Sequence, residues 1–468
     1  MNSILLGGFV GIMASGVPIA MAMCIASLLY IWISGTIPPL TVVHRMVGGI
    51  DSFPLLAVPF FILAGNLMNS AGITNRIYNF ALALVGWLKG GLGHVNVVGS
   101  VIFAGMSGTA VADAGGLGTI EIKAMQDHGY PTEFAVGITA ASATLGPIIP
   151  PSLPLVIYGV QANVSIGKLF AGGFIPGAVM AVFMMIMVSY YAHVRKYGAD
   201  IAFSWPRMGR AFLELGAVSV TAVVLYFLWS NETMGGFVRF GIPLIAVLIA
   251  DKWFKFEAFM ALLTPVILIG GMASGLFTPT EAAVAAVAWA LFLAFVWYKT
   301  MTWQMLVKVS METIETTATV LFIVAAASIF AWVLTTTQVT EAIAAWVLSL
   351  SSSPYVFLLL ANLFLLFVGC FMETIAAITI LVPVFMPIVA KLGIDPVHFG
   401  LIMVLNLMIG LLTPPVGMVL FVLQKVAKLS FEETVRAVLP WIWPLLATLA
   451  LITYVPSLVL WLPGILYK

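Results

Sequence analysis

The sequence predicts an all-α polytopic membrane protein that contains two internal repeats. Its 468 residues are 62% hydrophobic and 8% charged, with a mean hydropathy of +1.14. Apolar runs of about 17 to 25 residues, the length needed to cross the hydrocarbon core, recur along the whole chain. The sequence GPIIPP (146–151) returns as GLLTPP (410–415). Composition therefore favours a single membrane domain, and the recurring proline pair favours a repeated unit within it.

Residues 1–54 are expected to form N-terminal scaffold helices. The chain starts without a basic region or a small-residue cleavage site, so this stretch is interpreted as a retained span and not as a signal peptide. A net charge of +1 gives no electrostatic case for nucleic acid binding. The two cysteines lie far apart, and the five histidines form no HExxH motif. Neither residue type therefore predicts a disulfide, a redox pair or a metal centre.

Two repeats are predicted over residues 55–190 and 315–468. A shift of 264 residues superimposes the two proline motifs without a gap. The same shift places Gly105, Ala112 and Leu117 on Gly369, Ala376 and Leu381. Two separate motifs keep one offset, which identities that arise by chance would not be expected to do, so we interpret them as parts of a repeated unit. In the first repeat, after a scaffold arm, we expect a hairpin over about 94–120 and a broken helix over about 132–160. In the second, we expect a hairpin over about 355–391, a broken helix over about 398–425 and a C-terminal helix.

Residues 191–314 connect the repeats. The segment HVRKYGADIAFSWPRMGR carries four lysines and arginines against one aspartate, which predicts a cytoplasmic loop. Two apolar stretches over about 211–252 predict an extra helix pair, followed by scaffold helices. The motif TPTE (278–281) has the order of a capped helix start, so a structural role for Glu281 is at least as favoured as a functional one.

The proline pairs are predicted helix breaks: Pro150 with Pro151, and Pro414 with Pro415. Proline removes a backbone N–H and disturbs the preceding turn, which leaves carbonyls unpaired. In lipid each unpaired group costs several kcal/mol, so a break persists where it lines a cavity or coordinates a ligand. Freed carbonyls suit a small alkali cation, and the next half-helix N-terminus suits an anion. A simple proline kink is the alternative for either pair alone, and the constant offset disfavours it.

The glycine-rich segment AGMSGTAVADAGGLG (104–118) is predicted to be the tip of a re-entrant hairpin. It contains polar residues, including Asp113, between apolar arms too short to span a bilayer. Glu373 and Thr374 hold the matching place in the second repeat. Intramembrane carboxylates are functional candidates by default. Asn66, Asn362 and Asn406 are interpreted as interhelical hydrogen-bond partners.

Five sequence blocks carry a family resemblance and cover nearly the whole chain in order. They are MSGTAVADAGGLG, LGPIIPPSLPLVIYG with NVSIGKLFAGGFIPG, GLFTPTEAAVAAV, NLMIGLLTPPVGMVLF and LITYVPSLVLWLP. With these blocks the chain resembles the large membrane subunit of a tripartite ATP-independent periplasmic (TRAP) transporter, the DctM-like permease. The resemblance implies the elevator fold of the ion transporter superfamily, with two inverted repeats that each contain a re-entrant hairpin and a discontinuous helix.

The resemblance also implies function and partners. A multi-pass protein of the bacterial inner membrane is expected, which imports an organic acid of the C4-dicarboxylate or sugar acid class by sodium symport and is not an enzyme. Sodium is the coupling ion, and no other cofactor is expected. The expected partners are a small four-helix membrane subunit, a periplasmic binding protein and membrane lipid. Family members usually have a shorter connection in place of residues 211–252, so a separate small subunit is less firmly implied.

The matching motifs imply three groups of site residues. The first sodium site would use Gly105, Ser107, Gly108, Gly146 and Pro147. The second would use Gly369, Glu373, Thr374, Gly410 and Thr413. The substrate would meet Ser107, Thr109, Asp113, Ser152 and Ser165.

Two other functions remain alternatives. A stand-alone sodium and anion symporter of the same superfamily would work without a binding protein. An intramembrane hydrolase using Asp113 or Glu373 would need a metal-ligand set or a nucleophile with its base, and the sequence contains no HExxH, GxGD or GxSG motif. A passive channel is disfavoured, because paired broken repeats suit alternating access better than a fixed pore.

Overall fold

The computed structural model describes residues 2–35, 37–38, 40–230, 242–254, 258–350 and 353–467. Over these residues the chain is built from helices, and a single isolated bridge between Lys89 and Ala199 is its only β pairing. Seven helical segments of the described chain are long and apolar enough to cross a membrane. They are Phe53–Ser70, Ile166–Val194, Trp205–Trp229, Pro279–Trp297, Trp303–Thr336, Thr374–Lys391 and Phe431–Tyr454. The predicted all-α polytopic membrane fold is therefore confirmed.

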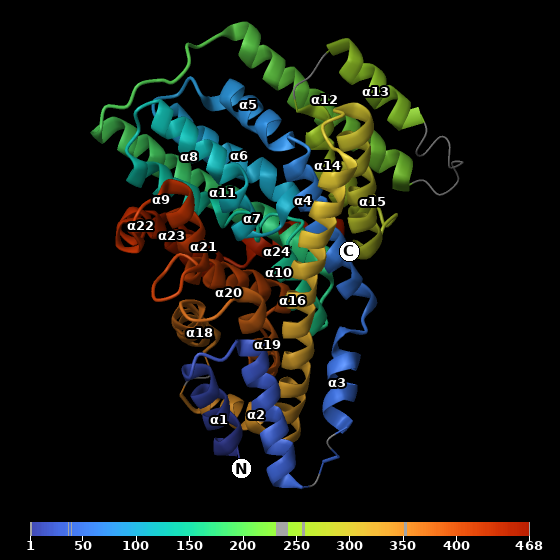
Figure 1. The fold of residues 1–468 in the computed structure, drawn as a ribbon, viewed down its shortest axis with the longest axis vertical. Helices are drawn as coiled ribbons and strands as arrows, with labels where there is room; N and C mark the ends of the chain where they lie inside the picture. The colour runs from blue at the N-terminus through green and yellow to red at the C-terminus, as the bar shows by residue number, and fades with distance from the viewer. Residues whose placement is uncertain are drawn as a thin grey trace.

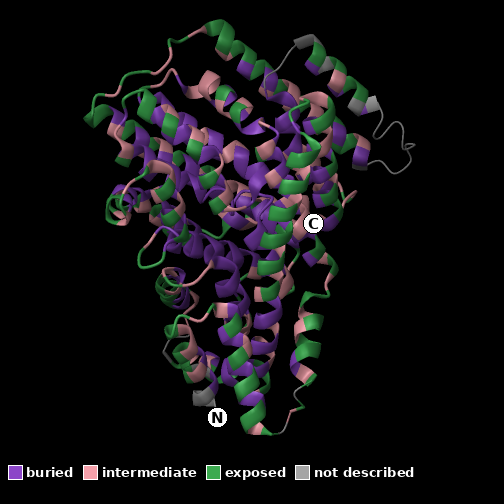
Figure 2. Cartoon of the chain, in the orientation of Figure 1, coloured by how far each residue is buried: buried purple, intermediate pink, exposed green. Residues whose placement is uncertain are grey.

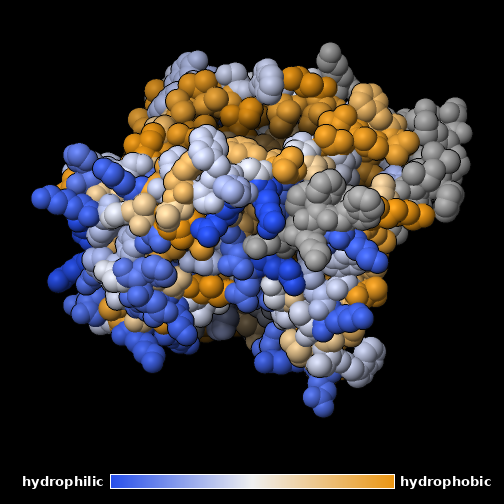
Figure 3. Space-filling model, turned by 90° about the horizontal axis from the view of Figure 1, so that it is seen from above, coloured by the Kyte–Doolittle hydropathy of each residue, from blue (hydrophilic) through white to orange (hydrophobic). Residues whose placement is uncertain are grey.

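The surface is divided in the way expected of a membrane protein. In Figure 3 hydrophobic residues cover much of the upper part of the view, and polar residues gather at the lower left. Many large apolar side chains are exposed on outer helices, including Phe227 on α12 (Trp205–Ser230) and Trp346 on α17 (Val339–Leu350). Exposed apolar area of this kind is stable only where lipid or another protein covers it.

The N-terminal helices pack along one long helix of the second half. α1 (Asn2–Ala14), α2 (Ile19–Ser34) and α3 (Leu40–Ile50) lie at one end of the molecule, and α2 and α3 run beside α16 (Trp303–Thr336) (Figure 1). With 34 residues, α16 is about 51 Å long at 1.5 Å per residue. The guanidinium of Arg45 lies 4.9 Å from the ring centre of Trp332, a cation–π contact that joins α3 to α16.

The first repeat contains eight α-helices after the short 3₁₀ turn Phe53–Leu56. They are α4 (Ala57–Ser70), α5 (Ile73–Val85), α6 (Gly91–Ser107), α7 (Ala110–Gly115), α8 (Leu117–Asp127), α9 (Thr132–Ala143), α10 (Leu153–Ala162) and α11 (Ile166–Val194). We refer to α6, α7 and α8 together as hairpin 1. The helix is interrupted between α9 and α10 by nine residues, 144–152.

The connecting region contains α12, α13 (Ile242–Phe254), α14 (Phe259–Ala273) and α15 (Pro279–Phe292), which continues as a π-helical turn, Leu293–Trp297. α12 and α13 lie at the end of the molecule opposite the N-terminus (Figure 1). Thr278 and Glu281 form a capping box at the start of α15: Thr278 Oγ1 accepts from the Glu281 N–H at 3.3 Å, and Glu281 Oε2 accepts from the Thr278 N–H at 2.8 Å. The structural interpretation of Glu281 is confirmed.

The second repeat follows α16 and α17. Its helices are α18 (Pro354–Gly369), α19 (Thr374–Lys391), α20 (Pro396–Gly410), α21 (Met418–Ala427), α22 (Phe431–Val438), α23 (Ile442–Tyr454) and α24 (Ser457–Leu466), with a 3₁₀ turn Leu439–Trp441 between α22 and α23. We refer to α18 and α19 as hairpin 2. Residues 411–417 separate α20 from α21, as 144–152 separate α9 from α10.

The two repeats pack into each other reciprocally. α7 of hairpin 1 contacts α21, the second half of the other repeat's broken helix, and α10 contacts α19 of hairpin 2. The Tyr158 hydroxyl of α10 donates to the Pro396 carbonyl at 2.7 Å. Figure 2 shows the buried residues concentrated where these helices meet. The core of the protein is therefore shared between the repeats.

Buried asparagines join helices within this core. Asn406 Nδ2 donates to Asn362 Oδ1 at 2.8 Å, and Asn362 Nδ2 donates to Thr453 Oγ1 at 3.0 Å, which links α20, α18 and α23. Asn66 Nδ2 donates to Thr313 Oγ1 at 3.1 Å, which links α4 to α16. The predicted interhelical role of Asn66, Asn362 and Asn406 is confirmed.

Candidate functional site

The first helix break meets the tip of hairpin 1 through backbone contacts. α6 ends at Ser107, and Gly108 follows with φ of +64°, a left-handed angle that favours glycine. The Gly108 carbonyl accepts from the Leu153 N–H at 3.3 Å, and a Cβ at Gly108 would lie 2.7 Å from the Pro151 carbonyl oxygen. The tip and the break therefore touch with no side chain between them.

Polar groups are gathered at this contact. Ser107 is buried, and its hydroxyl has no hydrogen-bond partner. A Cβ at Gly146 would lie 3.3 Å from the Thr109 carbonyl oxygen, so this carbonyl faces the break. Ser152 caps α10: its hydroxyl accepts from the Leu155 N–H at 3.2 Å and donates to the Pro147 carbonyl. Ser107 directly precedes Gly108 in the chain, so this contact region combines an unpartnered hydroxyl with backbone carbonyls, the oxygen donors that suit an alkali cation.

The second break meets hairpin 2 even more closely. A Cβ at Gly410 would lie 2.4 Å from the carbonyl carbon of Gly369, and a Cβ at Gly369 would lie 3.0 Å from the Gly410 Cα. The Cys370 carbonyl accepts from the Val416 N–H at 3.2 Å. Thr413 Oγ1 donates to the Gly410 carbonyl at 2.9 Å and lies 3.1 Å from Cys370 Sγ. Hairpin and break are again in direct backbone contact.

Residues at the two hairpin tips occupy equivalent positions. Thr109 is the N-cap of α7, where its Oγ1 accepts from the Ala112 N–H at 3.2 Å. Glu373, at the same place after the 264-residue shift, is the N-cap of α19, and its Oε2 accepts from the N–H groups of Ile375 and Ala376 at 2.9 and 3.1 Å. The neighbouring Thr374 is buried with an unpartnered hydroxyl. The sequence repeat is thus also a repeat of local geometry.

Three residues of the predicted site lie away from these contacts. Gly105 faces α14, because its Cβ would lie 2.6 Å from Pro265 Cγ. Asp113 is 1% exposed and lies in the interior of hairpin 1 near Glu121. Ser165 caps α11 at the far end of α10, beside a cavity of about 380 Å³. The structure does not bring these three residues into the contact between the tip of hairpin 1 and the first break.

Sequence reasoning missed Cys370. It lies in the tip of hairpin 2, where its carbonyl accepts from the Val416 N–H and its Sγ contacts Thr413 Oγ1. The only signal in the sequence was its position directly after Gly369, since its apolar surroundings suggested an ordinary core cysteine.

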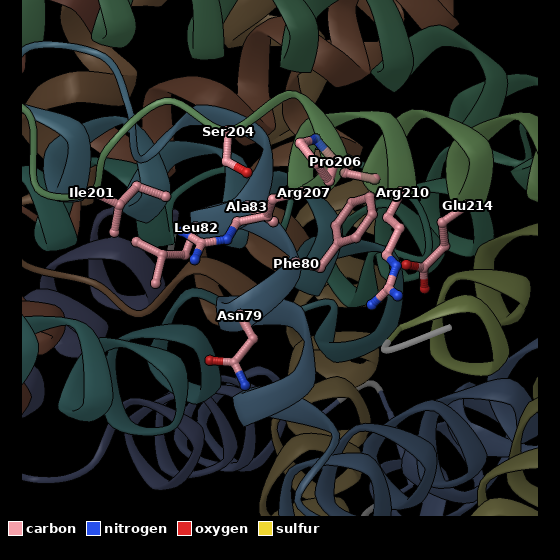
Figure 4. A pocket seen from close by; sticks show the side chains of 11 residues that line it. Asn79, Phe80, Leu82, Ala83, Ile201, Ser204, Pro206, Arg207, Arg210 and Glu214 are labelled. Atoms are coloured by element: carbon pink, nitrogen blue, oxygen red, sulfur yellow. The ribbon is translucent and has the colours of Figure 1, made fainter. Parts of the chain in front are cut away.

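A separate polar cavity lies outside the breaks. It measures about 650 Å³ and lies between α5, residues 201–206 and α12. Polar groups in its lining come from five residues, Asn79, Ser204, Arg207, Arg210 and Glu214 (Figure 4). Its two arginines belong to the basic segment that the sequence assigns to the cytoplasmic side.

The two breaks differ in exposure. Residues 144–152 of the first break are buried, whereas Pro414, Pro415 and Val416 of the second are exposed. Two hairpins that meet two broken helices in a membrane protein, one break covered and one open, are the architecture of a secondary transporter.

Solved transporter structures share this fold. The YdaH transporter of Alcanivorax borkumensis superimposes with a TM-score of 0.53 at 15% identity, over 88% of this chain and 87% of that one. MtrF of Neisseria gonorrhoeae gives a TM-score of 0.55 at 13% identity, over 89% and 84%. At these identities the likeness shows the fold alone.

The chain belongs to the DctM component family of tripartite ATP-independent periplasmic transporters, whose family model matches residues 6–458. It is 43% identical to the sialic acid TRAP transporter large permease protein SiaM of Vibrio cholerae, over 97% of both chains. It is 39% identical to the sialic acid TRAP transporter permease protein SiaT of Haemophilus influenzae, over 97% of this chain and 67% of SiaT.

A third relative is the C4-dicarboxylate TRAP transporter large permease protein DctM of Pseudomonas aeruginosa, 39% identical over 88% of this chain and 87% of the relative. The family resemblance drawn from the motifs is therefore confirmed. The protein is a transporter permease of the bacterial inner membrane and not an enzyme, which excludes the intramembrane hydrolase.

Proposed function

We propose that this chain is the large permease of a sodium-coupled transporter that imports an organic acid by an elevator motion. The observation that carries the proposal is the direct contact between a hairpin tip and a helix break in both repeats, at one sequence offset. Each contact combines backbone carbonyls with a hydroxyl group, from Ser107 in the first repeat and Thr413 in the second. Such oxygen donors suit Na⁺.

In this proposal the hairpins and broken helices of the two repeats provide the moving part, and the N-terminal and connecting helices, with the scaffold arm of the first repeat, provide the scaffold. The buried first break and the exposed second break support a structure that is open on one side of the transport cycle. Alternating access requires this kind of asymmetry, because substrate must leave on the side opposite to its entry. The reciprocal packing of α7 with α21 and of α10 with α19 supports motion of both sites as one body.

We infer the substrate class from the substrates that appear in the names of the relatives. Sialic acid and C4-dicarboxylates share a carboxylate, so the proposed cargo is a small organic acid of the sugar acid or C4-dicarboxylate class. The substrate carboxylate would approach Thr109, which is partly exposed, next to the buried Ser107 at the tip of hairpin 1. A periplasmic binding protein would deliver it, and a small four-helix membrane subunit would cover part of the exposed apolar scaffold.

Reconstituted uptake tests the proposal. The chain and its small subunit are placed in proteoliposomes with an inward sodium gradient, and uptake of labelled sialic acid and succinate is measured with and without the acid-loaded binding protein. Uptake should require both sodium and the binding protein. Uptake that proceeds without the binding protein would favour the stand-alone symporter. Uptake at the same rate with and without the sodium gradient would refute the coupling of transport to sodium.

Point variants assign the site. Ser107→Ala and Thr413→Ala should each weaken sodium activation about 5- to 150-fold, the equivalent of about 1 to 3 kcal/mol for a lost cation contact. The matched control is Ser219→Ala on the exposed face of α12, whose hydroxyl bonds only to its own helix at the Leu215 carbonyl. Wild-type sodium dependence in both site variants would exclude these residues as ligands.

A further inference from the structure

Hairpin 1 and the neighbouring helix α9 together hold a second group of buried polar residues that the helix breaks do not use. Its members come from α6, α7, α8 and α9, and each is at most 1% exposed. They are Asn96, Ser100, Asp113, Glu121, Thr139 and Ser142. We call this group the hairpin 1 cluster.

Asn96 organises one half of the cluster. Its Nδ2 donates to Glu121 Oε2 at 2.6 Å and to Thr139 Oγ1 at 2.8 Å, and its Oδ1 accepts from the Ser142 hydroxyl at 2.7 Å. Both N–H donors of the amide and its oxygen are therefore bonded within the cluster. Thr139 and Ser142 lie on α9 shortly before the first break, so Asn96 joins hairpin 1 to the broken helix.

Each carboxyl of the cluster retains one oxygen without a partner. Glu121 Oε1 and Asp113 Oδ2 are both buried and accept no hydrogen bond from the described residues. Ser100 faces the Asp113 carboxyl, and Asp113 and Glu121 are close enough to repel each other electrostatically. Two carboxylates in this position would place two negative charges in a low-dielectric interior.

The surrounding helices supply no compensating charge. Among the described residues, no lysine or arginine acts on either carboxyl, and the ion pair found in that part of the chain, Lys308 with Glu312, lies on α16. α5 contributes Tyr78, which faces Glu121, while the cluster residues of α6 and α9 are uncharged. Two adjacent buried carboxyl groups without a cation cannot both be ionised.

We propose that Asp113 and Glu121 bind one proton between them, so that hairpin 1 holds a proton-binding site separate from the two helix breaks. Asn96 presents its N–H to Glu121 Oε2, so the unpartnered oxygens Glu121 Oε1 and Asp113 Oδ2 are the positions left for the proton. α6 packs directly on this group, since a Cβ at Gly99 would lie 2.9 Å from Glu121 Oε1. A proton needs one free acceptor oxygen, whereas a metal ion needs several, and only Glu121 Oε1 and Asp113 Oδ2 of the cluster are without a hydrogen-bond partner.

Loss of this proton would leave two buried negative charges on α7 and α8. The Asn96 bonds connect this group to α9, which leads into the first break.

Infrared spectroscopy of the purified full-length protein in detergent tests for the proton directly. The wild type should show the carbonyl band of a protonated carboxyl, and this band should shift in D₂O. Asp113→Asn with Glu121→Gln should remove the part of the band that this proton contributes. Asp395→Asn is the matched control and should leave the band at its wild-type intensity, because Asp395 caps α20 outside the cluster, where its Oδ1 accepts from the N–H groups of Val397 and His398. Absence of the band in the wild type, or an unchanged band intensity in the double variant, would overturn the proposal.

Two further measurements keep the proposal testable if the double variant does not fold. In Glu121→Gln alone the band should disappear or shift, because the proton loses its partner carboxyl, and an unchanged band would refute the pair. In the wild type the band should be the same in sodium and potassium buffers. A band that appears only without sodium would show that the cluster binds sodium and not a proton.

The pH dependence of stability gives an independent readout. Above the ordinary carboxyl pKa of about 4, the unfolded chain has lost a proton that the native cluster keeps. Native-state stability should therefore fall as pH rises, by up to about tenfold in the unfolding equilibrium per pH unit for one proton. The double variant should lose this slope, and a wild-type slope in the double variant would contradict the assignment. These readouts do not involve transport, so they remain valid if the proposed function fails.

Discussion

The contact between Gly369 and Gly410 allows the most direct test of how the second site is built. Gly410→Ala adds a methyl group 2.4 Å from the Gly369 carbonyl carbon and 2.7 Å from its oxygen. Both neighbours are backbone atoms, so no side chain can rotate away. To reach an ordinary contact of 3.4 Å, hairpin 2 and α20 must separate by about 1 Å.

The energetic cost follows from this displacement. Forcing an extra methyl group into a packed contact costs about 1 to 3 kcal/mol. If the cost falls on the closed arrangement that binds sodium, apparent sodium affinity should weaken about 5- to 150-fold. The chain should still insert into the membrane, because the change adds one apolar carbon.

Sodium-dependent thermal stabilisation of the purified protein measures the effect. The concentration of sodium that gives half of the maximal stabilisation is compared between wild type, Gly410→Ala and the control Gly216→Ala. Gly216 lies within α12 with no atom within 4 Å of its added Cβ, so the control adds the same group without a clash. Wild-type sodium affinity in Gly410→Ala would show that this backbone contact is not part of a sodium site.

Three further variants separate structural from functional residues. Gly108→Ala should reduce uptake without loss of insertion, because a left-handed angle costs a residue with a Cβ about 1 to 2 kcal/mol and the methyl would meet the Pro151 carbonyl; normal uptake would contradict this. Asn406→Leu should lower stability to thermal unfolding by about 1 to 3 kcal/mol, since it leaves buried Asn362 without its donor; an unchanged transition would show the network to be dispensable. Glu281→Ala removes the capping box of α15 and should lower the thermal transition slightly while uptake keeps its sodium dependence, and a changed sodium dependence would restore a functional role for Glu281.

The sequence predicted the features that are decided by neighbouring residues in the chain, such as helix breaks and helix caps. It also predicted those that follow from the repeat. Adjacent prolines break helices wherever they occur, so both interruptions could be predicted from Pro150 and Pro414 with their neighbours. The single offset of 264 residues also relates Thr109 to Glu373, and both are helix caps. The TPTE motif gave the start of α15 for the same local reason.

Side-chain direction could not be predicted in this way. Asp113 follows Thr109 by one helical turn, yet it faces Ser100 and Glu121 inside hairpin 1, because the packing of α6, α8 and α9 decides which face of a short helix is buried. The burial of Glu121 could not be predicted either, since it lies in a stretch with other charged residues, a pattern typical of a loop. The meeting of Cys370 with Thr413 depends on how two segments 43 residues apart fold together.

The reciprocal packing of the repeats has a consequence for biosynthesis. Gly115 on α7 faces Val422 on α21, with 3.7 Å between an added Cβ and the valine side chain, so these partners are about 300 residues apart in the chain. Domains fold from the N-terminus during synthesis at about 5 to 20 residues per second. At the slower rates, tens of seconds therefore pass between the synthesis of hairpin 1 and the synthesis of α21, which covers it. During that time its glycine-rich tip faces lipid or the insertion machinery, and a chain that ends before α21 leaves it uncovered permanently.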